Sequence, residues 1–266
     1  MSLFNENENI AVEALGLTKT GDENKILDSV SFSFNKKGVH GILAPAGGGK
    51  TALLDVIACA SDFDEGKLTV DGIEIKANGA GSKSAREAKK KIGYVRQRCE
   101  FYPEMTPVEI LNFVGNARGE APDKLARQIK EALELVGLEE VANRLVSRLS
   151  HTEEKMLGYA AAIVGNPDIL IIDEPKSKAT AEKTEVINGI VRMFGKRKTV
   201  IIATEDYKTA RALCDDVVIL SDGSALAHGS FDELEEKLAK GDISKNATLE
   251  SLYTSLVKVS KNRVTR

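Results

Sequence analysis

Alternating and continuous apolar segments divide the chain into two kinds of predicted strand. Residues 10–16 and 30–34 alternate apolar and polar positions, the pattern of strands exposed on one face, and a polar turn at 21–24 separates them. Residues 67–75 predict a further pair of strands joined by a tight turn. Short, almost continuously apolar runs predict strands buried in a parallel sheet, and they comprise residues 39–43, 168–172, 199–203 and 216–220.

Between residues 98 and 163 the apolar spacing becomes that of amphipathic helices. Thr106 and Glu109 have the spacing of a capping box, which predicts the start of one helix. A second helix is expected at about 122–136 and an alanine-rich one at about 151–164. We therefore expect an α/β fold in which a helical segment interrupts a mainly parallel sheet.

Composition narrows the class of protein. The chain has 266 residues and a formal charge of −3, which suits one sizeable α/β domain and gives no support for nucleic-acid binding. Three scattered cysteines, Cys59, Cys99 and Cys214, favour a reducing compartment over a disulfide framework. No apolar run has the length of a bilayer span, and the polar first nine residues do not resemble a secretory signal. We therefore expect a cytoplasmic protein.

A glycine-rich segment, APAGGGKT at residues 44–51, joins the apolar run 39–43 to a stretch expected to be helical. It matches the phosphate-binding loop pattern, except that Ala44 replaces the first glycine. Glycines allow backbone N–H groups to surround an anion, and the N-terminus of the next helix adds partial positive charge. Lys50 is expected to reach the β- and γ-phosphates and Thr51 to bind Mg²⁺. The alternative is a glycine-rich turn that happens to precede a lysine.

Asp173 and Glu174 follow the apolar run 168–172. An acidic residue at the end of a buried strand can hold Mg²⁺ directly or through water, the role expected of Asp173. The next carboxylate can activate an attacking water, which makes Glu174 a candidate catalytic base. The alternative is that both carboxylates only end the strand. The candidate nucleotide-binding residues are Ala46, Gly47, Gly48, Gly49, Lys50, Thr51 and Ala52.

With these motifs the chain resembles the ATP-binding subunits of ABC transporters, from residue 10 to about residue 256. The segment IGYVRQ at 92–97 is similar to the family's Q-loop. The resemblance implies that Gln97 senses Mg²⁺ and the attacking water, as a catalytic residue and metal ligand beside Thr51 and Asp173. Residues 101–106 and 248–253 are similar to exporter members of the family.

The resemblance implies an α/β P-loop NTPase of the ABC type, with a mainly parallel sheet core, an antiparallel β lobe and an inserted helical lobe. It implies one domain, residues 1–266, with the core and β lobe at 1–97 and 164–233, the helical lobe at 98–163 and a C-terminal helical tail at 234–266. The implied cofactors are ATP and Mg²⁺. Two such subunits, in a homo- or heterodimer, would sandwich ATP and move a separate transmembrane subunit. The protein would be peripheral at the inner face of the membrane.

The family's signature motif is altered. Residues 149–153 read LSHTE, whereas the family has Leu-Ser-Gly-Gly-Gln or close to it. In the family the glycine N–H groups approach the γ-phosphate held by the partner, and side chains at those positions hinder this approach. Ser150 and Glu153 instead predict a capping box.

Three further positions depart from the family. Glu205 stands where the H-loop has histidine, so a charged acceptor replaces a hydrogen-bond donor near the γ-phosphate. Thr180 replaces the D-loop aspartate, and no aromatic residue follows residues 17–19 to stack on adenine. Ala44 adds only one methyl group at the first position of the phosphate-binding loop, so we expect it to have a small effect on the loop.

Three functions follow from these observations. The first is a transporter subunit that couples dimer closure and ATP hydrolysis to a membrane subunit. The second is a hydrolysis-deficient, nucleotide-gated regulatory or binding subunit, suggested by the altered signature and H-loop. The third, a soluble ABC ATPase of translation or DNA repair, is disfavoured because a second cassette or long coiled-coil insert does not fit in the chain.

Overall fold

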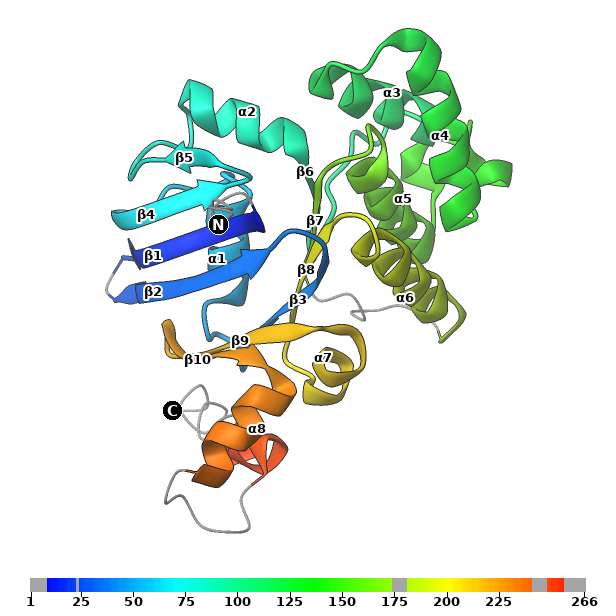
Figure 1. The fold of residues 1–266 in the computed structure, drawn as a ribbon. Helices are drawn as coiled ribbons and strands as arrows, with labels where there is room; N and C mark the ends of the chain where they lie inside the picture. Colours follow the sequence, from blue (N-terminus) through cyan, green and yellow to red (C-terminus); the bar gives the residue numbers. More distant parts are fainter. Residues whose placement is uncertain (1–8, 23, 174–180, 241–247, 256–266) are drawn as a thin grey trace, which may run out of the picture.

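The computed structural model describes residues 9–22, 24–173, 181–240 and 248–255, and their strands form two sheets (Figure 1). A four-stranded antiparallel sheet has the order β2-β1-β4-β5 and comprises β1 (Ile10–Thr20), β2 (Lys25–Asn35), β4 (Glu65–Val70) and β5 (Ile73–Ile75). A six-stranded sheet has the order β10-β9-β3-β8-β7-β6 and comprises β3 (Gly38–Leu43), β6 (Ile92–Val95), β7 (Ile169–Asp173), β8 (Thr199–Thr204), β9 (Asp216–Ser221) and β10 (Ser224–Ser230).

The six-stranded sheet is parallel except at one edge. Strand β3 pairs in parallel with β8 and β9, and β7 pairs in parallel with β6 and β8, whereas β10 runs antiparallel to β9. Every residue of β7 and β8 is buried, as their continuously apolar sequences predict. The predicted fold class, a mainly parallel core with an antiparallel β sheet and a helical insert, is confirmed.

The helices between residues 107 and 195 cover one face of the six-stranded sheet, and the helix at residues 50–57 lies with the four-stranded sheet on the other face (Figure 1). The labelled helices are α1 (Lys50–Ile57), α2 (Lys83–Lys91), α3 (Pro107–Arg118), α4 (Pro122–Val136), α5 (His151–Ile163), α6 (Ala181–Gly195), α7 (Tyr207–Leu213) and α8 (Phe231–Lys240), with short 3₁₀ turns at Glu139–Val141 and Val146–Arg148. Residues 249–255 are also helical and are called the C-terminal helix. None of the helices in the described ranges combines the length and apolar character needed to cross a bilayer.

Alternate side chains of the central strands enter two different cores. Leu170 and Ile172 of β7 pack in the cluster that includes residues of α3 to α6. Ile169 and Ile171, between them in sequence, pack in the cluster with α1 and the four-stranded sheet. The sheet is therefore buried on both faces, and its strand ends form an edge at which polar side chains can gather.

Strands β1 and β2 are longer than their alternating patterns predict. Pairing in β1 shifts between Ala14 and Leu17, and Gly16 within this bulge has a φ of 62°. Because the bulge interrupts the alternation, the pattern ends at Gly16 although the strand continues to Thr20. At the predicted turn the N–H of Gly21 donates to the carbonyl oxygen of Asn24, and Glu23 lies outside the described residues.

Helix α2 begins inside a segment that the sequence indicates as a loop, residues 77–84. The hydroxyl of Ser82 accepts a hydrogen bond from the N–H of Ala85, which caps the helix. Ala85 and Ala88 form its buried side, and the lysines and arginine of residues 86–91 lie mainly on the outside. The basic residues of 86–91 therefore form a solvated helix face.

Candidate functional site

The glycine-rich loop joins β3 to α1, in the order that a phosphate-binding loop requires. Gly47 and Gly49 have φ angles of 76° and 94°, which L side chains rarely adopt. A Cβ atom on Gly49 would also lie 3.1 Å from the carbonyl oxygen of Ile26. Ala44 does not have a positive φ, so the first position of the loop does not depend on glycine in this chain.

Lys50 and Thr51 contact the loop and the neighbouring strand from the first turn of α1. The Nζ of Lys50, a residue only 5% exposed, donates hydrogen bonds to the carbonyl oxygens of Ala44 at 3.0 Å and Pro45 at 2.9 Å. The hydroxyl of Thr51 donates to Oδ2 of Asp173 at 2.8 Å. Two of the three side chains expected to bind Mg²⁺, Thr51 and Asp173, are therefore in direct contact.

Asp173 ends β7 as a carboxylate that is only 1% exposed. Burial raises the pKa of Asp173 above its ordinary value, while the hydrogen bond from Thr51 and the charge of Lys50 act against this rise. Among the described residues, its Oδ1 has no hydrogen-bond partner. A buried carboxylate oxygen without a partner, next to a hydroxyl, is the oxygen-only donor set that Mg²⁺ prefers, so the residues fit this ion.

We expect Asp173→Asn to stabilise the ligand-free protein. The amide keeps the shape and can still accept from Thr51, but it has no charge to bury, so the unfolding free energy should rise by about 1 kcal/mol at neutral pH. Protonation of Asp173 removes its buried charge, and the raised pKa lets the folded protein take up this proton above the ordinary aspartate range. The stability advantage of the variant should therefore shrink as the pH falls toward that range. Urea unfolding of both proteins at neutral and acidic pH measures the difference, and equal stabilities at neutral pH would contradict it.

Gln97 follows β6 at the same edge of the sheet. The parallel pairing of β6 with β7 places Gln97 next to the strand that ends at Asp173. The Nζ of Lys155, on α5, donates to the carbonyl oxygens of Arg96 at 3.1 Å and Gln97 at 3.4 Å. Arg96 also pairs with Asp55 of α1 at 3.1 Å. The Q-loop is therefore tied both to α5 and to the helix that follows the phosphate-binding loop.

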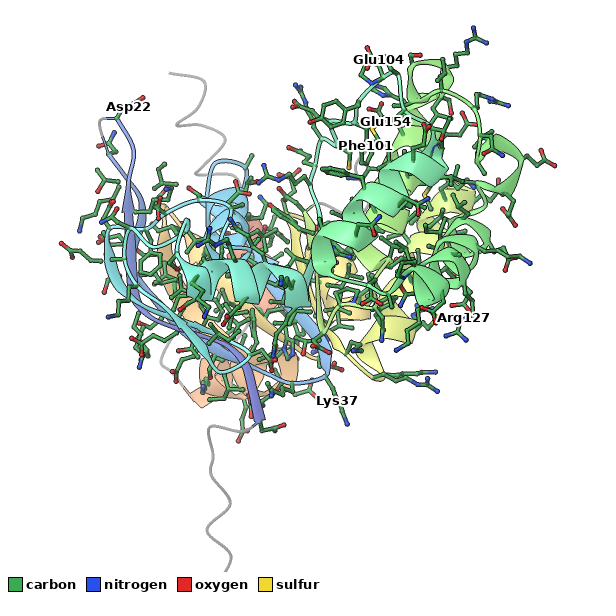
Figure 2. The ribbon with its side chains drawn as sticks, turned by 90° about the horizontal axis from the view of Figure 1, so that it is seen from above. Asp22, Lys37, Phe101, Glu104, Arg127 and Glu154 are labelled. Atoms are coloured by element: carbon green, nitrogen blue, oxygen red, sulfur yellow. The ribbon has the colours of Figure 1, made fainter. Side chains whose placement is uncertain are left out.

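A pocket of about 340 Å³ separates the Q-loop from the N-terminus of α5. It is lined by Gln97, Arg98, Cys99, Glu100, His151, Glu154 and Lys155. Figure 2 shows Glu154 near the loop that carries Phe101 and Glu104, at one end of the helical region. The signature segment and the Q-loop thus face each other across a gap lined by both positive and negative side chains.

The altered signature forms the predicted capping box. The hydroxyl of Ser150 accepts from the N–H of Glu153 at 3.2 Å, and the carboxylate of Glu153 accepts from the N–H of Ser150 at 2.7 Å. These hydrogen bonds lower the pKa of Glu153. The N-terminus of α5 therefore already holds a carboxylate of its own chain, that of Glu153, directly after the two positions where the family has glycines.

Glu205 lies at the end of β8, close to the phosphate-binding loop. The carbonyl oxygen of Thr204 accepts from the N–H of Ala44 at 3.3 Å, which joins the ends of β8 and β3. Glu205 itself is exposed, and its carbonyl oxygen accepts from the hydroxyl of Tyr253 at 2.9 Å. The predicted positions Glu174 and Thr180 lie outside the described residues.

Three contacts at this edge were missed from the sequence: the pair of Arg96 with Asp55, the bond from Lys155 to Arg96, and the bond from Tyr253 to Glu205. Each of them links segments far apart in the chain, so local pattern did not indicate them. For Tyr253 one signal was available, because Leu249 and Tyr253 are four residues apart and both are buried in the C-terminal helix.

The sequence is similar to one protein family and to several known ATP-binding proteins. The family described as ABC transporter matches residues 27–177. The methionine import ATP-binding protein MetN 2 of Salmonella choleraesuis is 29% identical over 79% of this chain, which spans 62% of that protein. MetN of Lactobacillus acidophilus is 30% identical over 92% of this chain and 72% of its own length. The linearmycin resistance ATP-binding protein LnrL of Bacillus subtilis is 29% identical over 85% of this chain and 71% of its own length.

Solved structures show the same fold. An ATP-binding subunit of an ABC transporter superposes with a TM-score of 0.81 at 20% identity, covering 92% of this chain and 99% of the other. A dimeric post-hydrolysis ATP-binding cassette bound to ADP and Pi gives a TM-score of 0.74 at 24% identity, over 82% of this chain and 98% of the other. The family match covers more than half of the chain, and the described fold agrees with it. The chain therefore belongs to the ABC transporter family, among its ATP-binding cassettes.

Proposed function

We propose that this chain is the ATP-binding subunit of an ABC transporter and that it binds Mg-ATP at residues 44–51. The observation that carries the proposal is the contact of Thr51 with the buried carboxylate of Asp173, directly beside the loop that holds Lys50. The proposed nucleotide-binding residues are Ala46, Gly47, Gly48, Gly49, Lys50, Thr51 and Ala52.

Each side chain has a proposed role. The ammonium of Lys50 would exchange its two loop carbonyls for phosphate oxygens, because a charged phosphate is the stronger acceptor. Thr51 and Asp173 would hold Mg²⁺, which supplies charge neutralisation at the phosphates. Gln97, at the same edge, would contact the ion and the attacking water, and Glu174 would accept a proton from that water.

The proposed partners are a second cassette and a separate transmembrane subunit, which would hold this chain at the inner face of the membrane. Family membership supports this transport role over a purely regulatory subunit and over a soluble ATPase of translation or DNA repair. The relatives are named for methionine import and for linearmycin resistance, so we assign neither a transported compound nor a direction. The likeness to exporters stays a prediction.

ATP affinity and phosphate release, measured on one purified sample with and without Mg²⁺, test the proposal. We expect ATP binding strengthened by Mg²⁺, and a slow phosphate release that Glu174→Gln abolishes while ATP stays bound. Glu104→Gln, on an exposed loop, is the matched control and should change neither quantity. Absence of ATP binding would contradict the proposed function, and phosphate release that survives Glu174→Gln would contradict the role of Glu174 alone.

A further inference from the structure

The C-terminal helix at residues 249–255 is anchored in an aromatic cluster. Tyr253 is 3% exposed, and its ring centroid lies 6.3 Å from that of Tyr207, which in turn lies 5.6 Å from Phe231. The guanidinium of Arg211 lies 5.0 Å from the ring centroid of Phe231. The helix thus packs against Tyr207 at the start of α7, the helix that follows Glu205 and Asp206.

The hydroxyl of Tyr253 contacts Glu205, the residue at the H-loop position. This hydroxyl donates to the carbonyl oxygen of Glu205, the first residue after β8, at 2.9 Å. The residue before it, Thr204, accepts a hydrogen bond from the N–H of Ala44, and the carbonyl oxygen of Ala44 accepts from Nζ of Lys50. Three hydrogen bonds and short lengths of backbone therefore connect the C-terminal helix to the lysine of the phosphate-binding loop.

We propose that Tyr253 is a positioning residue, which fixes the backbone of Glu205 and so couples the C-terminal helix to the γ-phosphate of bound ATP. The proposal rests on the proposed function, because it requires ATP at residues 44–51. Packing alone does not need the hydroxyl, since the ring is already buried among Tyr207 and the core residues. The hydroxyl contacts one backbone atom, and that atom belongs to the residue at the H-loop position.

The direction of the coupling follows from charge. Glu205 is exposed at the strand end beside the loop, so its carboxylate repels a γ-phosphate more than it repels the terminal phosphate of ADP. Without the hydroxyl of Tyr253 the backbone of Glu205 is less fixed, and the carboxylate can move away when ATP binds. Coupling of this kind is reciprocal, so bound ATP should also change the local stability of the C-terminal helix more than bound ADP does.

Calorimetric titration of Mg-ATP and Mg-ADP into the wild type and Tyr253→Phe tests this inference. We expect the variant to raise the ratio of ATP to ADP affinity by about fivefold, chiefly through ATP. Tyr102→Phe, which removes the hydroxyl of a tyrosine that is 62% exposed, is the control and should leave the ratio unchanged. An unchanged ratio in Tyr253→Phe, or equal changes for both nucleotides, would overturn the inference while leaving the proposed function intact.

Hydrogen exchange of the wild type gives a second test that does not depend on the variant folding. We expect amide exchange in residues 249–255 to differ between the ATP-bound and ADP-bound protein, by linkage. Identical exchange with both nucleotides would overturn the inference. Failure of the wild type to bind either nucleotide would instead overturn the proposed function.

Discussion

Lys50→Met should weaken Mg-ATP binding by about a hundredfold, or roughly 2.7 kcal/mol. The substituted side chain has a similar length but no ammonium, so it can neither donate to phosphate oxygens nor neutralise their charge. The fold should survive, because the variant also removes a buried charge, which offsets the loss of its bonds to Ala44 and Pro45. Titration calorimetry with Mg-ATP gives the affinity, and thermal unfolding verifies that the fold is intact.

The matched control is Lys67→Met, which makes the same change on β4. Lys67 pairs with Glu74 at 3.1 Å on the exposed side of the antiparallel sheet, and an exposed pair of this kind contributes little to stability. We expect its ATP affinity to equal that of the wild type. If Lys50→Met binds Mg-ATP as tightly as this control, residues 44–51 are not the phosphate site.

The central sheet and the phosphate-binding loop were predictable because residue type decides them locally. Strands such as β7 and β8 are buried on both faces, so their sequences are continuously apolar and stand out without any knowledge of partners. In the loop, the positive φ angles of Gly47 and Gly49 require glycine, so the conformation is visible in the sequence. The capping box at Ser150 is equally local, and it too is confirmed.

What was not predictable depends on contacts between distant segments. The bulge at Gly16 extends β1 beyond its alternating pattern, because pairing with β2 and β4 continues past the break. The bond from Tyr253 to Glu205 spans 48 positions, and that from Lys155 to Arg96 spans 59. No local pattern specifies these pairs, since only the folded topology brings the ends of β6 and β8 to one edge.

Two of the altered family motifs, the signature and the H-loop, place negative charge where the resemblance leads us to expect phosphate. Glu153 caps α5 with its own carboxylate, and Glu205 follows the strand beside the phosphate-binding loop. Unit charges about 4 Å apart interact by about 4 kcal/mol at an effective dielectric of 20, and screening near the surface reduces this value. In the proposed dimer we therefore expect both carboxylates to oppose γ-phosphate binding, one at each face that the dimer would bring together.

Restoring the family's residues at both places should raise phosphate release by about a hundredfold, since single preorganised donors at developing charge contribute about that much or more. The variant combines Glu205→His with His151→Gly, Thr152→Gly and Glu153→Gln, so that a donor replaces one carboxylate and free N–H groups replace the other. The lost capping box should cost about 1 kcal/mol of stability.

Two controls separate the causes of this increase. Glu205→Gln removes the charge without supplying the imidazole donor, so it should give only part of the increase seen with Glu205→His. Adding Glu174→Gln to the restored variant should abolish phosphate release and leave ATP bound, with an ATP-dependent dimer detectable by light scattering. If the restored variant binds Mg-ATP but releases phosphate no faster than the wild type, the carboxylates of Glu153 and Glu205 do not limit turnover. The step that limits phosphate release would then depend on parts of the site that the membrane subunit has to complete. Addition of that subunit to the wild type should in that case raise the rate of phosphate release, although the substitutions did not.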